Sequence, residues 1–396
     1  MRGSIKQRSK GSWTIILDVG RDPATGKRRQ KWETIRGTKR EAEKRLAELQ
    51  HQLNTDTYVT SSKLTVAEFL YQWLESYVSS NCRESTYERY KGVIDDHLIP
   101  DMGSIPLSEL KAAHLQTHYS KALKEGRKSS GPSEGLSPWT VRKHHVTLRE
   151  ALSHALKWGL VSKNVTLAVD PPKPPRPEAR ALDGDDAQYI LTSAQGTIWH
   201  PIFHLALYTG MRRGEILGLR WKDVDLNLSV LYIAQAMQQL DDGRVIIQEP
   251  KTPNSRRSVA LSPVAAISLR SHRERQEVDF LTVERPFTPQ TLVFERADGT
   301  TPVPDSVTHA FTRYAQKAGV HGVHLHNLRH THASLMLKAG VHPKIVSERL
   351  GHSSVAFTLD TYSHVTPGLQ EAAALKFDQT LTRSDANTEV SKPAVR

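Results

Sequence analysis

The sequence predicts a multidomain protein that is mainly α-helical, with small β-sheets near its N-terminus and in its C-terminal half. The chain has 396 residues, which is too long for one ordinary hydrophobic core and indicates two or three domains. A segment with five prolines, residues 169–180, forms a semi-rigid linker between them. Apolar residues recur at helical spacing along most of the chain, whereas residues 1–37 and 229–250 contain short strand-like runs and turn residues.

The charge balance indicates a polyanionic partner, with nucleic acid as the leading candidate. The net charge is +12, and residues 1–40 alone hold twelve Lys and Arg against three acidic residues, a net +9. The single cysteine, Cys82, excludes an intramolecular disulfide framework and a cysteine-cluster metal site. No apolar run is long enough to span a bilayer, and no signal-peptide stretch follows Met1. We therefore expect a cytoplasmic protein that acts without membrane contact.

The first domain is expected over residues 1–60. Two strand-like runs, residues 11–20 and 28–35, flank a turn rich in Asp, Pro and Gly, and residues 4–8 are a candidate third strand. A helix with a narrow apolar stripe should start at Thr38. The candidate DNA contacts are the cations of the second run, Arg28, Arg29 and Lys31. A solvated basic hairpin without a DNA-binding role would have the same composition.

The second domain, residues 64–165, is predicted to be wholly helical. Four segments have helical apolar spacing, residues 65–78, 85–98, 106–123 and 137–160. Thr65 is a plausible N-cap of the first. The basic cluster of the last segment would be a DNA-binding face or, equally well, a solvated surface; it comprises Arg142, Lys143, His144 and His145.

The third domain, residues 182–369, begins with a strong arginine motif. A buried helix over residues 200–208 should break at Gly210, and the next helix should start at Arg213. The break leaves Arg212 at a helix start, with Glu215 one turn on to hold it by an ion pair. A salt-bridged surface arginine is the simpler alternative. A tail, residues 370–396, follows the domain, and residues 369–381 indicate a short amphipathic helix.

Two strand-like runs, residues 229–240 and 244–250, are joined by a turn at Asp241, Asp242 and Gly243. Lys251 follows directly in a Pro-Lys-Thr sequence, with Ser255 and Arg257 shortly after it. A lysine at this position does not by itself indicate catalysis. Lys251 becomes a candidate catalytic residue only together with the motifs around it.

The stretch from His324 to His364 concentrates cations and one tyrosine. A helix that starts near His326 places His326 and Arg329 on one face. Gly340 should end this helix, Pro343 should open the next, and Gly351 should stop it. His352 follows the stop. Tyr362 comes ten residues later, on a short helix that Ser353 or Ser354 could cap.

A metal site is the alternative for this histidine-rich stretch, because His326 and His330 have the spacing of helical metal ligands. No Glu follows His326, no Cys is near, and Arg329 would repel a cation. We therefore expect no metal and no other cofactor. His330, His332 and His342 are expected to be structural.

These motifs, in this order, resemble the active-site boxes of tyrosine recombinases, the phage-integrase family: Thr-Gly-x-Arg-x-x-Glu from Thr209, Pro-Lys-Thr from Pro250, His-x-x-Arg from His326, Leu-Gly-His from Leu350, and then a tyrosine. The resemblance implies six catalytic residues, Arg212, Lys251, His326, Arg329, His352 and Tyr362, with Glu215 in support. Residues 64–369 then correspond to a helical, SAM-like core-binding domain and an α+β catalytic domain. The first sixty residues are similar to an arm-type DNA-binding domain, and Arg257 would face a phosphate.

The resemblance also implies a mechanism without metal. Arg212 and Arg329 hold the phosphate oxygens, and Tyr362 attacks phosphorus to form a 3′-phosphotyrosyl link. Lys251 protonates the departing 5′ oxygen. His352 donates a hydrogen bond. His326 either takes the phenolic proton or holds the phosphate.

The implied function is that of an integrase, which integrates or excises a mobile element through a Holliday junction. The implied partners are double-stranded DNA at core and arm attachment sites, three further copies of the chain in a homotetramer, a directionality factor and a host DNA-bending protein. Alternatives are a chromosome- or plasmid-resolving recombinase, a type IB topoisomerase-like nicking-closing enzyme, and a DNA-binding regulator without catalysis. The extra N-terminal domain favours the integrase, and the complete set of six residues argues against the regulator.

Overall fold

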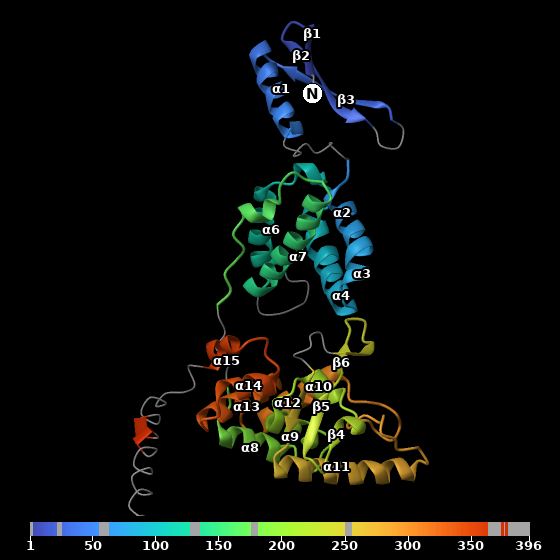
Figure 1. The fold of residues 1–396 in the computed structure, drawn as a ribbon, viewed down its shortest axis with the longest axis vertical. Helices are drawn as coiled ribbons and strands as arrows, with labels where there is room; N and C mark the ends of the chain where they lie inside the picture. Colours follow the sequence, from blue (N-terminus) through green and yellow to red (C-terminus); the bar gives the residue numbers. More distant parts are fainter. Residues whose placement is uncertain are drawn as a thin grey trace, which may run out of the picture. The chain divides into compact units, whose positions relative to one another are not determined.

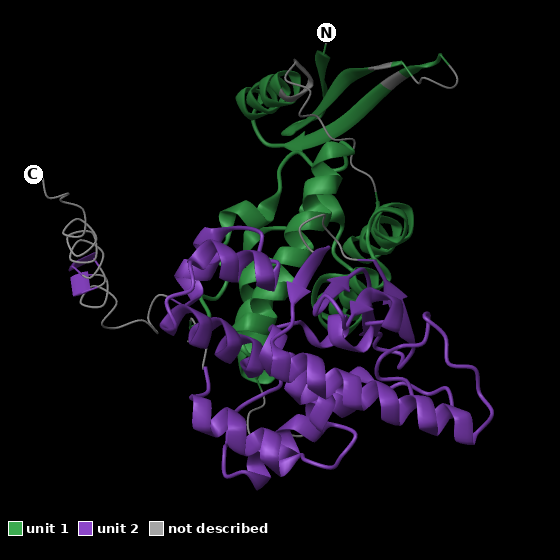
Figure 2. Ribbon diagram, turned by 60° about the horizontal axis from the view of Figure 1, so that its bottom comes forward, with its two compact units in different colours: residues 1–175 green, residues 176–396 purple. Residues whose placement is uncertain are grey.

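The computed structural model describes residues 3–21, 26–54, 63–126, 135–175, 181–249, 256–362, 374–375 and 377–378. It divides into two compact units, residues 1–175 and 176–396, which are distinguished by colour in Figure 2. The predicted class is confirmed: the described residues are mostly helical, with small antiparallel sheets (Figure 1).

The N-terminal part of the first unit is a three-stranded antiparallel sheet with one helix. Its elements are β1 (Gly3–Ser9), β2 (Ser12–Arg21), β3 (Arg28–Arg36) and α1 (Lys39–Asn54), and the sheet order is β1-β2-β3. Ile15 and Leu17 alternate toward α1, where Leu49 is also buried. The opposite face carries Trp32, which is 64% exposed. The predicted strands and helix are therefore present.

The remainder of the first unit is helical. Its main helices are α2 (Val66–Trp73), α3 (Ser79–Asn81), α4 (Glu84–Val93), α5 (Ile99–Met102), α6 (Ala112–Glu125) and α7 (Pro138–Lys157). Single π-helical turns join α2 to α3 and α4 to α5. Thr65 caps α2 in a capping box with Glu68. The third predicted segment is shorter than expected, because Leu110 and Lys111 are extended and α6 starts only at Ala112.

The basic cluster of α7 is divided between its two faces. Arg142 and Lys143 are exposed, whereas His144 and His145 are buried, so the expectation that all four residues share a DNA-binding face was wrong. The helical period places both histidines on the apolar side of α7. His144 Nδ1 lies 3.2 Å from His118 Nε2. Burial lowers the pKa of His144 to about 3, so its ring is neutral at pH 7 and adds no positive charge.

The second unit packs helices around two small sheets. Its helices are α8 (Gly184–Ser193), α9 (His200–Thr209), α10 (Arg213–Leu217), α11 (Pro263–Thr282), α12 (Pro304–Lys317), α13 (His326–Lys338), α14 (Pro343–Leu350) and α15 (Val355–Tyr362). Its strands are β4 (Val224–Asp225), β5 (Val230–Ile233), β6 (Ala236–Gln239), β7 (Val245–Gln248) and β8 (Arg257–Ala260).

The prediction of one continuous strand over residues 229–240 was wrong. The run at residues 229–240 is two strands that belong to different sheets: β5 lies between β4 and β8, whereas β6 pairs with β7. The chain leaves the first sheet at Gln235, whose amide donates to the Gly218 carbonyl at 2.8 Å. The turn predicted at residues 241–243 joins β6 to β7.

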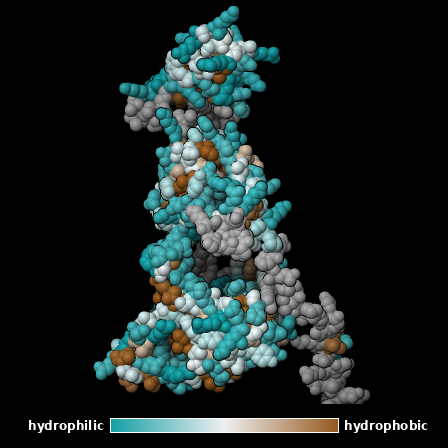
Figure 3. Space-filling view, turned by 180° about the vertical axis from the view of Figure 1, so that it is seen from behind, coloured by the Kyte–Doolittle hydropathy of each residue, from teal (hydrophilic) through white to brown (hydrophobic). Residues whose placement is uncertain are grey.

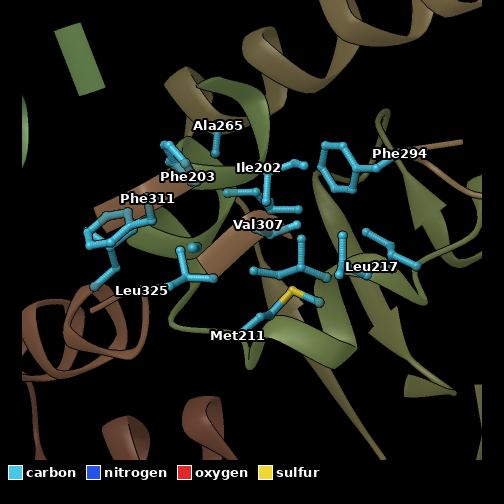
Figure 4. Close-up of a cluster of buried hydrophobic side chains, with 14 of the residues drawn as sticks. Ile202, Phe203, Met211, Leu217, Ala265, Phe294, Val307, Phe311 and Leu325 are labelled. Atoms are coloured by element: carbon cyan, nitrogen blue, oxygen red, sulfur yellow. The ribbon is translucent and has the colours of Figure 1, made fainter. Parts of the chain in front are cut away.

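The core of the second unit supports the functional residues. Figure 4 shows side chains from α9, α10, α11 and α12 in one cluster, where the rings of Phe203 and Phe311 meet edge to face with centroids 5.3 Å apart. No helix among the described residues is long and apolar enough to cross a membrane. The face in Figure 3 is mainly hydrophilic, with small scattered hydrophobic patches.

Candidate active site

The break between α9 and α10 positions Arg212. Gly210 ends α9 in the left-handed conformation, with φ 66°. A Cβ at Gly210 would lie 2.6 Å from Leu350 Cδ2 and 2.7 Å from the His332 ring, so only glycine fits between these elements. Arg212 then stands at the N-cap of α10 with 42% of its side chain exposed. Arg212 is therefore more exposed to an approaching anion than Arg257 and Arg329, which are both buried.

The carboxylate of Glu215 is buried beneath Arg212 and binds two guanidinium groups. Arg212 Nη1 donates to Oε1 at 2.9 Å and the Arg212 backbone N–H donates to Oε2 at 2.8 Å. Arg257 donates to both oxygens, at 3.0 Å and 2.9 Å. Burial alone would raise the pKa of Glu215, but the hydrogen bonds and charges of the two arginines outweigh it and hold this pKa below its ordinary value. The ion pair expected between Arg212 and Glu215 is present.

Arg257 points into the protein. Its side chain is 6% exposed, and its Nε donates to the Arg349 carbonyl at 2.7 Å. Because its guanidinium is engaged by Glu215 and by α14, this placement does not match the phosphate-facing position expected from the sequence. In the structure Arg257 ties β8 to α10 and α14.

Arg329 is held by the carboxyl-terminal ends of two helices. Its Nη1 donates to the Gly210 carbonyl and its Nη2 to the Leu350 carbonyl, both at 2.7 Å. These carbonyls lie at the ends of α9 and α14, where the helix dipoles are negative. Burial, and next the charge of Arg212, lower the pKa of Arg329 to about 9, which still leaves the side chain charged at pH 7.

Two histidines lie near these arginines. His326 is exposed at the start of α13, where partial desolvation and the charges of Arg329 and Arg212 lower its pKa. His352 follows Gly351, and its Nδ1 lies 2.8 Å from the Thr358 hydroxyl. Burial and the neighbouring arginines lower the pKa of His352 to about 4. A neutral ring that accepts at Nδ1 keeps its proton on Nε2, which can donate to an anion.

Tyr362 ends α15, a helix that begins after Ser354, whose hydroxyl accepts from the Phe357 N–H at 3.2 Å. The tyrosine is 1% exposed and packs against apolar residues of α13 and α14. Its hydroxyl lies 2.8 Å from His330 Nδ1, and its ring is parallel to that of His352 with centroids 6.4 Å apart. Burial raises the pKa of Tyr362, so the phenol is protonated at neutral pH.

Three family models match the chain. The model described as the phage integrase family matches residues 180–368, the phage integrase N-terminal SAM-like domain matches residues 65–123, and the arm DNA-binding domain matches residues 4–53. The chain belongs to the phage integrase family. The ICEBs1 integrase of Bacillus subtilis is 25% identical over 380 residues, which cover 96% of this chain and 100% of that protein. A XerC-like tyrosine recombinase of Caldanaerobacter subterraneus is 26% identical over 379 residues, which cover 91% and 94%.

Solved structures of integrases have the same fold. A Tn1549 transposon integrase bound to a circular intermediate DNA superposes with a TM-score of 0.65 at 20% identity, over 79% of this chain and 99% of that one. A lambda integrase tetramer bound to a Holliday junction superposes with a TM-score of 0.58 at 16% identity, over 92% and 95%.

The integrase-family chain thus has Arg212, Arg329, His326, His352 and Tyr362 on neighbouring elements of the second unit. Lys251, the sixth expected residue, lies outside the described residues, as do Ser255 and most of the predicted tail helix. Among described residues, no three or more His, Cys, Asp or Glu side chains are placed to hold a metal ion. In the first unit Arg28 is exposed and pairs with Asp18, and Lys31 lies 3.6 Å from Glu33. The side chain of Arg29 is outside the described part.

Sequence reasoning missed two contacts of this site. His330 was expected to be structural, but it bonds the Tyr362 hydroxyl. His332 accepts from Arg349 Nε at 3.0 Å, and its Nδ1 lies 2.8 Å from the Leu207 carbonyl. The visible signal in the sequence is the spacing of His330 one turn after His326, which by itself indicates a metal motif.

Replacing Glu215 with Gln should destabilise the second unit by about 3–5 kcal/mol, because Arg257 is left buried without its counter-charge. The unfolded carboxyl has the ordinary pKa of 4.5 and the folded one lies lower, so its stabilisation is present above pH 4.5 and is lost as pH falls through the folded pKa. Thermal unfolding of Glu215→Gln should therefore lose this acid dependence.

The matched control for Glu215→Gln is Glu277→Gln, which breaks an exposed pair with Arg273 on α11. It should change stability by roughly 0.5 kcal/mol or less. Equal effects of the two variants would contradict a central role for Glu215.

Proposed function

We propose that the chain is a tyrosine-type site-specific recombinase, an integrase of a mobile element, that cuts and rejoins DNA through a 3′-phosphotyrosyl intermediate. The observation that carries the proposal is the pairing of two positioned cations, Arg212 and Arg329, with a tyrosine hydroxyl that has a hydrogen-bond acceptor of its own. No chemistry in this set requires a metal, because guanidinium groups supply the positive charge that a phosphoryl transition state needs.

In the proposed reaction the scissile phosphate lies over Arg212 and Arg329. Arg212 reaches it from the exposed side, and Arg329 keeps further N–H groups for it after binding two carbonyls. His352 donates from Nε2. The Tyr362 oxygen attacks phosphorus, and Lys251 protonates the departing 5′ oxygen. Attack by a 5′ hydroxyl of another duplex reverses the step and exchanges the strand.

DNA is proposed to meet the chain on three surfaces. The catalytic cations contact the core site. Arg142 and Lys143, exposed on α7, contact the same core site from the helical domain. The sheet face that carries Trp32, with Lys6 and Thr14 beside it, contacts a separate arm site together with Arg28. Lys31 pairs opposite Leu17 and so lies on the other face, toward α1, which does not match the DNA contact expected from the sequence.

The assembly is proposed to be a homotetramer on two DNA sites that passes through a Holliday junction. A directionality factor and a host DNA-bending protein would set the direction of recombination. The alternatives are a recombinase that resolves chromosome or plasmid dimers and a type IB topoisomerase-like enzyme. The N-terminal sheet domain favours the integrase over both, because it supplies a second DNA-binding module beside the core site.

Tyr362→Phe should bind core-site DNA as well as the unchanged chain but form no covalent adduct, because only the nucleophilic oxygen is lost. The measurement is adduct formation on nicked suicide oligonucleotides built from the junctions that flank the element. Tyr208→Phe, on α9, is the control and should retain adduct formation. Adducts that persist in Tyr362→Phe, on Tyr208 or Tyr119, would assign the nucleophile elsewhere.

A variant that begins at Ser62 should cleave core sites but lose arm-site binding and most integrative recombination. The arm module carries most of the excess positive charge, so its binding should weaken with salt by a slope of about −0.9 per phosphate contact. Full recombination by the truncated chain at physiological salt would make the N-terminal region a nonspecific tail.

The double variant Arg142→Ala with Lys143→Ala should have the reverse effect. Its binding to core-site DNA should be weaker, and its binding to arm-site DNA should be unchanged.

A further inference from the structure

The hydroxyl of Tyr362 is hydrogen-bonded to a histidine outside the expected catalytic set. His330 lies on α13, directly after Arg329, and its Nδ1 is 2.8 Å from the Tyr362 hydroxyl oxygen. The ring is half-buried and its centroid is 5.6 Å from that of Tyr362. His326, one turn earlier on α13, is exposed and meets the His330 ring edge to face, with centroids 4.8 Å apart. Of the two histidines, His330 is the one hydrogen-bonded to the phenol.

The neutral ring of His330 can accept a hydrogen bond from the Tyr362 hydroxyl. Burial, and next the charges of His326 and Arg329, lower the pKa of His330 to about 4, so the ring is neutral at pH 7. The titratable groups that face it are His326 and Arg329 on its own helix, Tyr362 on α15, and His352 between α14 and α15. A neutral ring with its proton on Nε2 presents a lone pair at Nδ1 to the phenolic O–H.

We propose, on the basis of the function inferred above, that His330 is the general base that takes the proton of Tyr362 during DNA cleavage. As the Tyr362 oxygen forms its bond to phosphorus, its proton passes to His330 Nδ1, the bond from phosphorus to the 5′ oxygen breaks, and that oxygen takes a proton from Lys251. In the rejoining step the 5′ hydroxyl attacks phosphorus, and the imidazolium of His330 returns its proton to the phenol. This leaves His326 to hold the phosphate.

A phosphodiester between Arg212 and Arg329 strengthens this role. Burial is the main reason that His330 is neutral, and the charge of Arg329 adds to it. The negative charge of the phosphodiester offsets the Arg329 contribution, so DNA binding raises the pKa of His330 toward the range of an effective base. The same arginines stabilise the phenolate as it forms. The proton therefore passes from Tyr362 to His330 along one hydrogen bond, and the bound phosphodiester makes this transfer more favourable.

The test compares the full-length chain with His330→Asn on suicide oligonucleotides. The asparagine amide can occupy the position of Nδ1 and keep a hydrogen bond to Tyr362, but it cannot take a proton. At pH 7 its rate of adduct formation should be lower by roughly 10²–10⁴-fold, with unchanged DNA affinity and melting temperature. Between about pH 6 and pH 9 its rate should rise about tenfold per pH unit, because Tyr362 must then ionise on its own, whereas the unchanged chain should respond little.

Two controls accompany this test. His309→Ala removes an exposed histidine of α12 and should leave the rate and its pH profile unchanged. His326→Asn should weaken DNA cleavage without the steep rise with pH. A His330→Asn rate equal to that of the unchanged chain, one with the same pH profile, or a faster one would each overturn the inference; a faster rate would mean that the bond restrains the nucleophile.

The result is separable from the proposed function. If the unchanged chain forms adducts and His330→Asn is unimpaired, only the role of His330 fails. If the unchanged chain forms no adduct on any junction oligonucleotide, the proposed function fails. In that case nitrogen NMR of His330 still tests the acceptor, because a protonated Nδ1 at pH 7 would contradict it.

Discussion

The buried carboxylate of Glu215 is the interaction on which the site depends. It is the shared counter-charge of Arg212 and Arg257, and it lies where α10, β8 and α14 meet. Two buried charges are expensive to desolvate, so such a group stabilises a fold only when each of its hydrogen bonds is made. Here the two oxygens of Glu215 accept from a backbone N–H and two guanidinium groups. This arrangement turns one arginine outward to the substrate and fixes the other inside.

The ends of helices complete the site. α9 and α14 both end in a left-handed glycine, Gly210 and Gly351, and the carbonyls there bind Arg329 and Arg212. Arg349 repeats the pattern by donating to the Tyr208 carbonyl. Backbone carbonyls hold cations without neutralising them, so the guanidinium charge remains available to a phosphate. The sequence motifs of this integrase-family chain therefore do two things: they supply reactive side chains, and they fix where the helices end.

The sequence predicted the order of the elements and the pairing of Arg212 with Glu215, because caps, stops and ion pairs are local features. It could not predict which way Arg257 turns, since its partners Glu215 and Arg349 are distant along the chain. The basic cluster of residues 142–145 favours one charged face, but the helical period of α7 buries His144 and His145. The division of residues 229–240 between two sheets also involves partners outside the run, because β5 pairs with β8 and β6 with β7. The hydrogen bond of His330 could not be predicted, because its partner Tyr362 lies thirty-two residues later in the chain.

The most direct test of the account is a comparison of Glu215→Met with the double variant Glu215→Met and Arg257→Met, measuring both thermal unfolding and the rate of covalent adduct formation. The second substitution should restore stability, because no buried charge is left unpaired. Cleavage should stay as slow as in Glu215→Met, because Arg212 has lost the group that orients it. Recovery of cleavage together with stability would show that Arg212 needs no carboxylate beneath it, and would contradict the account.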